Sequence, residues 1–404
     1  MKKIISLTLA LLIFAAAALP SFAEVDVKSG YDYTRFKNDK ITLNVYNWGE
    51  YISNGNDDSV DVIDEFQKLT GITVNYTTFD TNESLYAKLK SGGGNYDVII
   101  PSDYMIGKMV KEDMLAELDF ANIPNASLIG DSYKKSDYDP ENKYSVAYMW
   151  GLIGIVYNKT MVDEGDLAEG WGLLWDEQYA GQILMFNNSR DAFGITSMLI
   201  GSEINPTAQA EIDACAEKLK AQKSVVQAYV MDEIFDKMGG GEAALAPYYA
   251  GDGITMMQDN PDLGMFIPQE GSNLYIDAMC IPKTSKNKQA AEMFINFMCE
   301  TSIALANAEY ICYSSPQIEV PALLDEEYSQ NPMMYPDEDM LSRCTTYSVL
   351  SDEINSAMDL AWSEVRSFDT SGNGWLMPVA LVLMLAISIF GFVRKWKKEH
   401  RNDY

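Results

Sequence analysis

Apolar residues along the chain change repeatedly between the spacing of two that is typical of strands and the spacing of three to four that is typical of amphipathic helices. This pattern predicts strands over residues 41–46, 72–79, 96–101, 181–186 and 275–282. It predicts helices within residues 59–71, 82–94, 102–115, 190–201, 206–222 and 287–309. Strands and helices that alternate in this order predict an α/β fold with a mostly parallel sheet.

The helix expected within residues 59–71 has the clearest boundaries. Ser59 precedes the apolar face as a possible N-cap, and Gly71 follows it as a terminator. The apolar face itself is formed by Val62, Ile63, Phe66 and Leu69.

The N-terminus has the pattern of an export signal. Lys2 and Lys3 precede an apolar run over residues 4–19, and the small residues Ser21 and Ala23 suggest cleavage after residue 23. We therefore expect residues 1–23 to be a signal peptide, with a retained N-terminal anchor as the alternative. The polar residues 24–40 are expected to form a lead-in to the first strand.

The C-terminus has the pattern of a membrane anchor. Residues 375–393 contain no charged side chain, and a helix of that length would extend about 28 Å, close to the roughly 30 Å hydrocarbon core of a bilayer. The basic block over residues 394–401 follows at once, which is the signature of a cytoplasmic flank. We expect a linker over residues 367–374, a single transmembrane helix over 375–393 and a cytoplasmic tail over 394–404. The remaining chain would then lie outside the cytoplasm at the cell membrane.

Charge and composition narrow the function classes. The chain has a formal charge of −29 although both termini are basic, so nucleic acid is an improbable partner and cations are favoured. The single histidine, His400, lies in the basic tail, and the five cysteines show no CxxC spacing. Zinc sites, Cys–His nucleophiles and Ser–His–Asp triads have no support, so we expect no metal, no cofactor and no catalytic residue. The pairing of the cysteines cannot be read from their spacing.

Aromatic residues recur beside carboxylates or hydroxyls near the predicted strands. In open α/β sheets ligands bind beyond the carboxyl ends of strands, so these positions form a candidate site. Ammonium groups need acceptors, whereas methylene groups need apolar walls, and aromatic rings beside carboxylates offer both. A polyamine fits this mixture. The positions concerned are Trp48, Glu50, Tyr51, Ser102, Asp103, Tyr104, Asn188, Asp191, Tyr248, Tyr249, Asp252, Tyr275 and Asp277.

Each of these positions also has a structural interpretation. Ser102 could serve only as a helix N-cap, Tyr248 and Tyr249 could fill the core, and Asp277 could be a turn residue.

The sequence resembles the spermidine/putrescine-binding proteins, the extracytoplasmic receptors of ABC polyamine importers, from about residue 41 to about residue 366. The resemblance rests on "YNWGEY", "NESLYAKL", "YDVIIPSDYMIGKM", "YSVAYMWG", "RDAFG", "YIDAMCIP" and "AEYICYSSP" in this order. It implies a two-lobed periplasmic-binding-protein fold of type II with a hinge. One lobe would comprise residues 41–150 with 276–320, and the other residues 151–275 with 321–366.

The resemblance also implies a ligand-binding role for ten residues and a partnership with permease subunits. Asp191 would bind a secondary amine, and Asp277 would pair with a terminal ammonium. The aromatic and hydroxyl side chains would line the slot. The ten residues are Trp48, Tyr51, Ser102, Tyr104, Asn188, Asp191, Tyr249, Tyr275, Asp277 and Tyr313.

The sequence departs from the family at several of these positions. Asn188 stands where members often have a carboxylate, and Tyr249 and Tyr275 stand where they often have tryptophan. The resemblance implies Tyr347 as the counterpart of a site glutamine. The preferred polyamine therefore stays open, as do a membrane-anchored sensor and a binding protein for another organic cation as alternatives.

Overall fold

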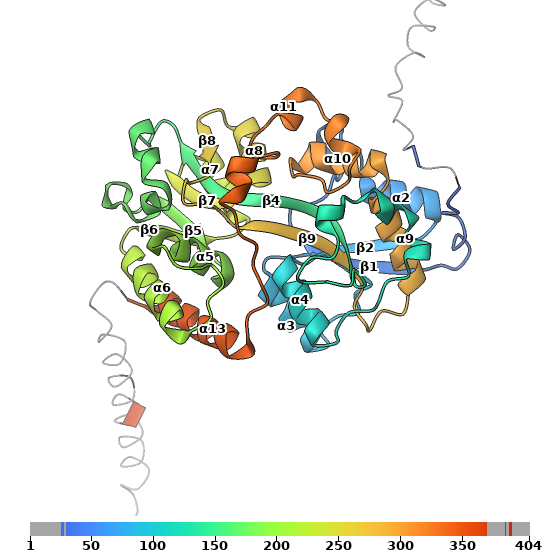
Figure 1. The fold of residues 1–404 in the computed structure, drawn as a ribbon, viewed down its shortest axis with the longest axis horizontal. Helices are drawn as coiled ribbons and strands as arrows, with labels where there is room; N and C mark the ends of the chain where they lie inside the picture. The colour runs from blue at the N-terminus through green and yellow to red at the C-terminus, as the bar shows by residue number, and fades with distance from the viewer. Residues whose placement is uncertain (1–25, 28–29, 370–383, 385–387, 390–404) are drawn as a thin grey trace, which may run out of the picture.

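The computed structural model describes residues 26–27, 30–369, 384 and 388–389 (Figure 1). Within them, nine strands form one sheet in the order β2-β1-β3-β9-β4-β7-β5-β6, with β8 paired to β4. The strands are β1 (Thr42–Trp48), β2 (Thr73–Phe79), β3 (Val98–Ile99), β4 (Ser145–Asn158), β5 (Ile183–Phe186), β6 (Val226–Val230), β7 (Leu245–Tyr249), β8 (Leu263–Phe266) and β9 (Leu274–Cys280).

The two ends of the sheet are parallel and its centre is antiparallel. β1 pairs in parallel with β2 and β3, and β5 pairs in parallel with β6 and β7. The long strands β4 and β9 pair antiparallel with each other and cross the middle of the molecule between these two groups (Figure 1). The prediction of a mostly parallel sheet is therefore right only for the ends, because β4 and β9 connect the groups in opposite directions.

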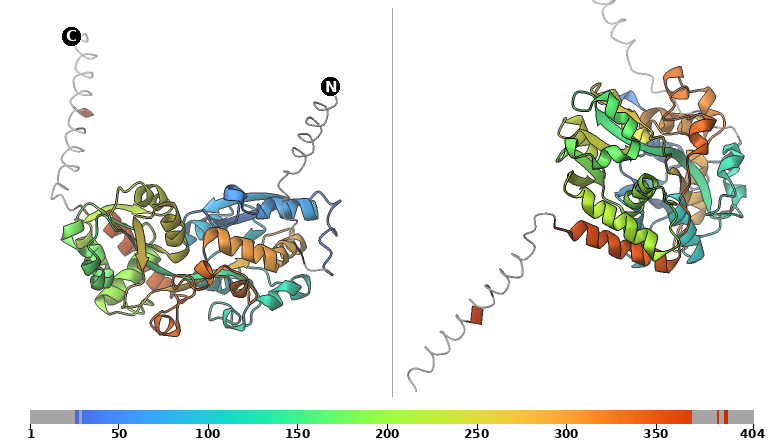
Figure 2. Two further views of the ribbon diagram at one scale, coloured as in Figure 1. Left: turned by 90° about the horizontal axis from the view of Figure 1, so that it is seen from above. Right: turned by 60° about the vertical axis from the view of Figure 1, so that its left-hand side comes forward.

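Helices cover both groups of strands (Figure 1). In the C-terminal part, α13 packs against α6 and α5, and Figure 2 shows α13 lying beside α6. The helices are α2 (Val62–Thr70), α3 (Asn82–Lys90), α4 (Asp103–Lys111), α5 (Ser189–Ile200), α6 (Gln209–Gln222), α7 (Glu233–Gly239), α8 (Ala250–Asp259), α9 (Lys288–Met298), α10 (Thr301–Ile311), α11 (Glu326–Ser329), α12 (Glu338–Ser342) and α13 (Asp352–Ser367).

Helix α2 confirms the predicted terminator and corrects the predicted N-cap. Gly71 adopts the left-handed conformation with φ of 73° and ends the helix, as expected. The N-cap is Asp61, whose carboxylate accepts a hydrogen bond from the backbone N–H of Asp64. Ser59 lies too early, because residues 56–58 form a separate 3-10 turn before the chain enters the helix.

Two further predictions of element bounds were wrong. The strand expected over residues 96–101 is reduced to β3, with two residues. The helix expected over 287–309 is divided into α9 and α10, because Glu300 between them has an extended backbone. The Glu300 carboxylate accepts a hydrogen bond from the hydroxyl of Tyr33 at 2.6 Å. The residue between the two helices therefore binds the N-terminal segment.

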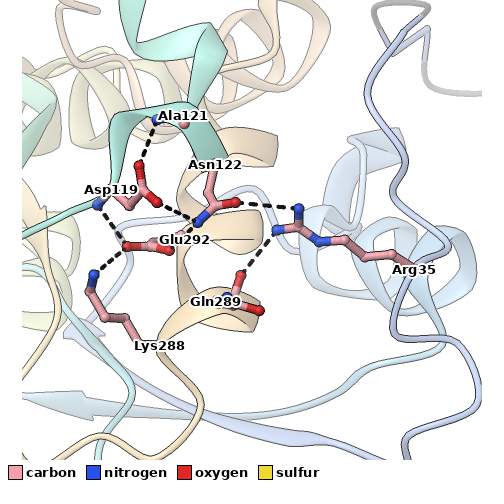
Figure 3. Close-up of polar contacts among 7 residues, drawn as sticks. All are labelled: Arg35, Asp119, Ala121, Asn122, Lys288, Gln289 and Glu292. Atoms are coloured by element: carbon pink, nitrogen blue, oxygen red, sulfur yellow. Dashed lines mark hydrogen bonds and ion pairs between the residues drawn. The ribbon is translucent and has the colours of Figure 1, made fainter.

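The lead-in segment is packed against the fold although its sequence is polar. The side chain of Tyr33 is only 3% exposed. Arg35 donates to the side-chain oxygen of Asn122 at 3.4 Å, and Asn122 donates to the buried carboxylate of Glu292 at 2.8 Å (Figure 3). These contacts attach residues 30–40 to α9 and to the segment that precedes β4.

The predicted ends of the chain lie largely outside the described residues. This holds for the signal peptide over 1–23 and for the transmembrane helix over 375–393, apart from residues 384, 388 and 389. Of the linker expected over 367–374, Ser367 belongs to the last turn of α13. Among the described helices, none has both the length and the apolar character needed to cross a bilayer. All five cysteines are unpaired.

Candidate functional site

A single cavity, here called the slot, brings together side chains from both groups of strands. Its cavity volume is about 50 Å³. All ten residues singled out from the sequence line it, and so does Tyr347. The structure therefore brings the residues named by the strand-end argument together with Tyr313, which only the resemblance suggested, around one cavity.

Asp277 lies on β9 and is 5% exposed. Its Oδ2 accepts a hydrogen bond from the hydroxyl of Tyr51 at 2.7 Å, whereas its Oδ1 has no hydrogen-bond partner in the described part of the chain. Burial raises the pKa of the Asp277 carboxyl to about 6. A buried carboxylate with one free oxygen is an acceptor prepared for a cationic donor.

Asp191 lies in the first turn of α5 and is 6% exposed. Its Oδ2 accepts hydrogen bonds from the hydroxyl of Tyr249 at 2.7 Å and from the amide of Asn188 at 2.8 Å. Burial raises the pKa of the Asp191 carboxyl, and these two donors act against that rise. Asn188 is also the N-cap of α5, because its side-chain oxygen accepts from the Asp191 backbone N–H at 2.8 Å.

Ser102 begins α4 without capping it. Its side chain makes no cap hydrogen bond, so the interpretation of Ser102 as only a cap is wrong. Instead its Oγ accepts from the Asn82 amide at 3.0 Å, and its backbone pairs with Asp277. The hydroxyl of Tyr104 on α4 donates to the carboxylate of Glu83 on α3 at 2.9 Å. Both residues line the slot.

Two further carboxylates line the slot. Asp252, in the first turn of α8, accepts a hydrogen bond from the Tyr313 hydroxyl at 2.9 Å. Asp232, just before α7, accepts from the Tyr248 hydroxyl at 3.2 Å. Burial raises the pKa of both carboxyls.

Aromatic rings form a continuous wall along the slot. Tyr249 meets Tyr275 edge to face with ring centroids 5.3 Å apart, and Tyr275 meets Tyr313 at 6.4 Å. Tyr51 packs on Tyr313 at 4.6 Å. Trp48, at the end of β1, also lines the slot. These rings offer apolar faces to a hydrocarbon chain and attract cations.

The slot has a strongly negative lining. Five carboxylates line it, and none of the lining residues in the described part of the chain is a lysine or an arginine. The nearest cation described in contact with its walls is Arg190, whose guanidinium lies outside the slot, 4.5 Å from the ring centroid of Tyr347 and 5.4 Å from that of Tyr104. The slot can therefore hold an elongated cation with several donors and apolar segments between them.

The sequence argument missed several lining residues. Asn82 and Glu83 follow the end of β2, so the same strand-end rule could have found them. Asp232 follows β6, a strand that was not predicted, and Tyr248 and Asp252 were noted at a strand end without being included among the ten. The lining residues that the sequence argument did not name are Gly49, Thr81, Asn82, Glu83, Met231, Asp232 and Asn273.

Comparisons with known proteins agree with this geometry. Residues 94–344 match the family model described as bacterial extracellular solute-binding protein. The spermidine/putrescine-binding periplasmic protein of Salmonella typhimurium is 33% identical over 306 residues, which cover 76% of this chain and 86% of that protein.

Solved structures agree as well. A putative spermidine/putrescine ABC transporter from Listeria monocytogenes is 36% identical with a TM-score of 0.76, covering 81% of this chain and 99% of that one. The spermidine/putrescine ABC transporter substrate-binding protein PotD from Streptococcus pneumoniae is 36% identical with a TM-score of 0.68 and the same coverage.

Proposed function

This chain belongs to the bacterial extracellular solute-binding proteins, and we propose that it is the polyamine-binding receptor of an ABC importer. The relatives named for spermidine and putrescine cover most of the chain. Membership of a solute-binding family agrees with the prediction that the chain is not an enzyme. The protein would bind its solute and release it unchanged to permease subunits.

The observation that carries the proposal is the pairing of buried carboxylates with tyrosine hydroxyls along an aromatic wall. Asp191 and Asp277 are each buried and each accept a hydrogen bond from a tyrosine. Buried carboxylates are costly unless a cation or several donors compensate them. A ligand with ammonium groups separated by methylenes would supply both the charge and the apolar surface.

We further propose that the receptor is exported and remains attached to the membrane. The uncharged run over residues 375–393 would span the bilayer, and the basic residues that follow it would stay in the cytoplasm. The binding part would then lie on the extracytoplasmic side. A detergent requirement for extraction of the full chain, lost after removal of residues 375–404, is the result expected from this anchor.

The mechanism proposed for transport is closure of two lobes around the ligand. The lobes would correspond to residues 41–150 with 276–320 and to residues 151–275 with 321–366, joined through β4 and β9. A ligand favours the closed state only if it binds that state better than the open one. Ligand contacts from Tyr51 and Ser102 on one side and from Asp191 and Tyr249 on the other would meet this requirement.

The proposal is tested by replacing Asp277. In Asp277→Ala, calorimetric titration with spermidine should show a loss of about 2–5 kcal/mol of binding free energy, because the partner of a buried ammonium is removed. Cys215→Ala is the control, since Cys215 is buried away from the slot. Equal effects of the two replacements on spermidine binding would mean that the site is misplaced.

A further inference from the structure

Arg190 is buried beside the slot without lining it. The side chain belongs to the first turn of α5 and is 3% exposed. Its Nη2 donates to Oδ1 of Asn205 at 2.7 Å and to the backbone carbonyl of Ser348 at 3.1 Å. Its Nε and Nη1 have no hydrogen-bond partner within the described residues. A buried guanidinium with incomplete hydrogen bonding is costly, so its charge needs a further partner.

Two aromatic rings contact this guanidinium. It lies 4.5 Å from the ring centroid of Tyr347 and 5.4 Å from that of Tyr104. The two rings also meet each other edge to face, with centroids 5.9 Å apart. Aromatic rings attract a cation, and the attraction is strongest where water is excluded. Tyr104, Arg190 and Tyr347 therefore form one cluster, here called the ring clamp.

The ring clamp joins segments that are far apart in the sequence. Tyr104 lies on α4, Arg190 on α5 and Tyr347 in the segment between α12 and α13. Helices α4 and α5 lie in different halves of the molecule (Figure 1). A Cβ atom on Gly107 of α4 would overlap a methyl group of Val349, so the segment before α13 also packs directly on α4. In the two lobes proposed above, Tyr104 belongs to the first and the rest of the clamp to the second.

The segment between α12 and α13 is fixed on the side of α5. Asn205 accepts a hydrogen bond from the backbone N–H of Ser348 at 2.9 Å through the same Oδ1 that accepts from Arg190. A Cβ atom on Gly194 of α5 would overlap the hydroxyl of Tyr347. The ring of Tyr347 is therefore held against α5, and a movement that opens the slot would part Tyr104 from the other two members of the clamp.

The charge of Arg190 also acts on a slot residue. Burial raises the pKa of the Asp191 carboxyl, and the charge of Arg190 acts against that rise. A lysine could supply this charge. It could not supply the planar fork that donates to Asn205 and Ser348 while it contacts two rings. The effect of the charge and the effect of the fork can therefore be separated by replacement.

We propose that Arg190 is a positioning residue that holds the slot closed by binding Tyr104 of the opposite lobe. This inference rests on the proposed function, because it assigns a residue to the proposed closure of the lobes. A contact made only in the closed form stabilises that form and slows release of the ligand, while capture by the open form is unchanged. The loss of Arg190 should therefore affect polyamines of different length by the same factor.

The experiment measures spermidine and putrescine binding to the full chain in detergent, by calorimetric titration and stopped-flow fluorescence. Arg190→Gln should weaken both ligands about tenfold through faster dissociation, as expected for the loss of a desolvated cation–π contact. Arg190→Lys should lose nearly as much, because it keeps the charge without the fork. Arg35→Gln is the matched control and should leave both affinities unchanged. The Arg35 guanidinium also lies near two rings, 5.4 Å from the centroid of Tyr31 and 5.0 Å from that of Phe36, but all three belong to the lead-in segment.

A double-mutant cycle tests the contact between the lobes. Tyr104 lines the slot, so Tyr104→Leu alone should weaken polyamine binding. In the Tyr104→Leu background, Arg190→Gln should add at most about twofold, because its partner across the slot is already gone. An equal cost of Arg190→Gln in both backgrounds would overturn the ring clamp.

The other outcomes also decide the question. Wild-type binding in Arg190→Lys would mean that only the charge beside Asp191 matters, and would overturn the positioning role. Slower association with unchanged dissociation would overturn it too. If Arg190→Gln does not fold, the dissociation rate of Arg190→Lys decides alone. A wild-type chain that binds neither polyamine would instead contradict the proposed function itself.

Discussion

At the scale of the residue, Asp277 has a buried carboxylate whose hydrogen bonding is incomplete in the ligand-free protein. Oδ2 of this carboxylate accepts the hydroxyl of Tyr51, and a hydrogen bond from Ser102 also lowers the pKa of the carboxyl. Oδ1 has no partner among the described residues, although the side chain is almost fully buried. An unpartnered buried charge destabilises the ligand-free fold, and an ammonium removes that cost. Binding sites commonly exchange stability for function in this way.

Replacement of Asp277 by asparagine should therefore separate stability from binding. We expect Asp277→Asn to leave the ligand-free thermal midpoint at pH 7 unchanged or raised, because no charge is buried. Spermidine should no longer raise that midpoint as it does for the wild type. A clear fall of the ligand-free midpoint, measured by differential scanning calorimetry, would mean that the Asp277 charge is compensated without ligand.

The raised pKa of Asp277, about 6, also predicts a pH dependence. Below pH 6 the carboxyl is protonated and cannot pair with an ammonium, so polyamine affinity should fall as the pH is lowered from 7.5 to 5. Ligand-free stability should change in the opposite direction over this range. The folded pKa is above that of the unfolded chain, so stability is gained as the pH falls through 6. Affinity that is flat across this range in calorimetric titrations would contradict the assignment.

Single residues also show how far the sequence predicts the site. The ten residues chosen from strand ends and from family resemblance all line the slot. Asp232 was missed because it follows β6, a strand that the sequence pattern did not predict. The role of Asn188 as the N-cap of α5 was not predicted either. From the sequence, the replacement of a carboxylate by an amide indicated only a weaker acceptor.

At the scale of the element, the sequence pattern predicts the bounds of a helix correctly where an apolar face is followed directly by a terminating residue. Helix α2 was placed within one or two residues because Gly71 ends it and Phe66 and Val62 are buried on its inner face. The division between α9 and α10 was missed, because Glu300 is a good helix former by propensity and its extended backbone is set by tertiary contacts. The antiparallel centre of the sheet was also missed, because β4 and β9 are far apart in the sequence and the local pattern does not indicate which strands pair.

The corrected N-cap of α2 gives a test at this scale. Asp61→Ala should lower the free energy of unfolding by about 1 kcal/mol, because the carboxylate that accepts from Asp64 is lost. Ser59→Ala is the matched control and should change stability little, since the Ser59 hydroxyl has no hydrogen-bond partner within the described residues. Chemical denaturation of both variants measures the difference, and a larger loss in Ser59→Ala would reverse the assignment of the cap.

At the scale of the whole molecule, the net negative charge of the chain and the acidic lining of the slot both favour a cationic ligand. The chain carries −29 formal charges, and the slot is lined by carboxylates without basic residues. A surface of this sign attracts a polycation over distances up to about 8 Å in physiological salt. Capture would therefore begin with long-range attraction and end with hydrogen bonds inside the slot.

This attraction predicts that salt slows association. The association rate constant of spermidine, measured by stopped-flow fluorescence, should fall by roughly tenfold between 20 mM and 500 mM salt. Dissociation should change much less, because the contacts in the slot are shielded from solvent. A rate that stays constant over this range would show that the acidic surface does not guide the ligand.

The central claim is that the slot binds a polyamine. Calorimetric titration of the full chain in detergent with putrescine, spermidine and spermine, and with arginine and choline as controls, tests it most directly. We predict one-to-one binding of at least one polyamine, with much weaker binding of both controls. A folded protein that binds none of the three polyamines, or that binds arginine or choline as tightly, would contradict the claim.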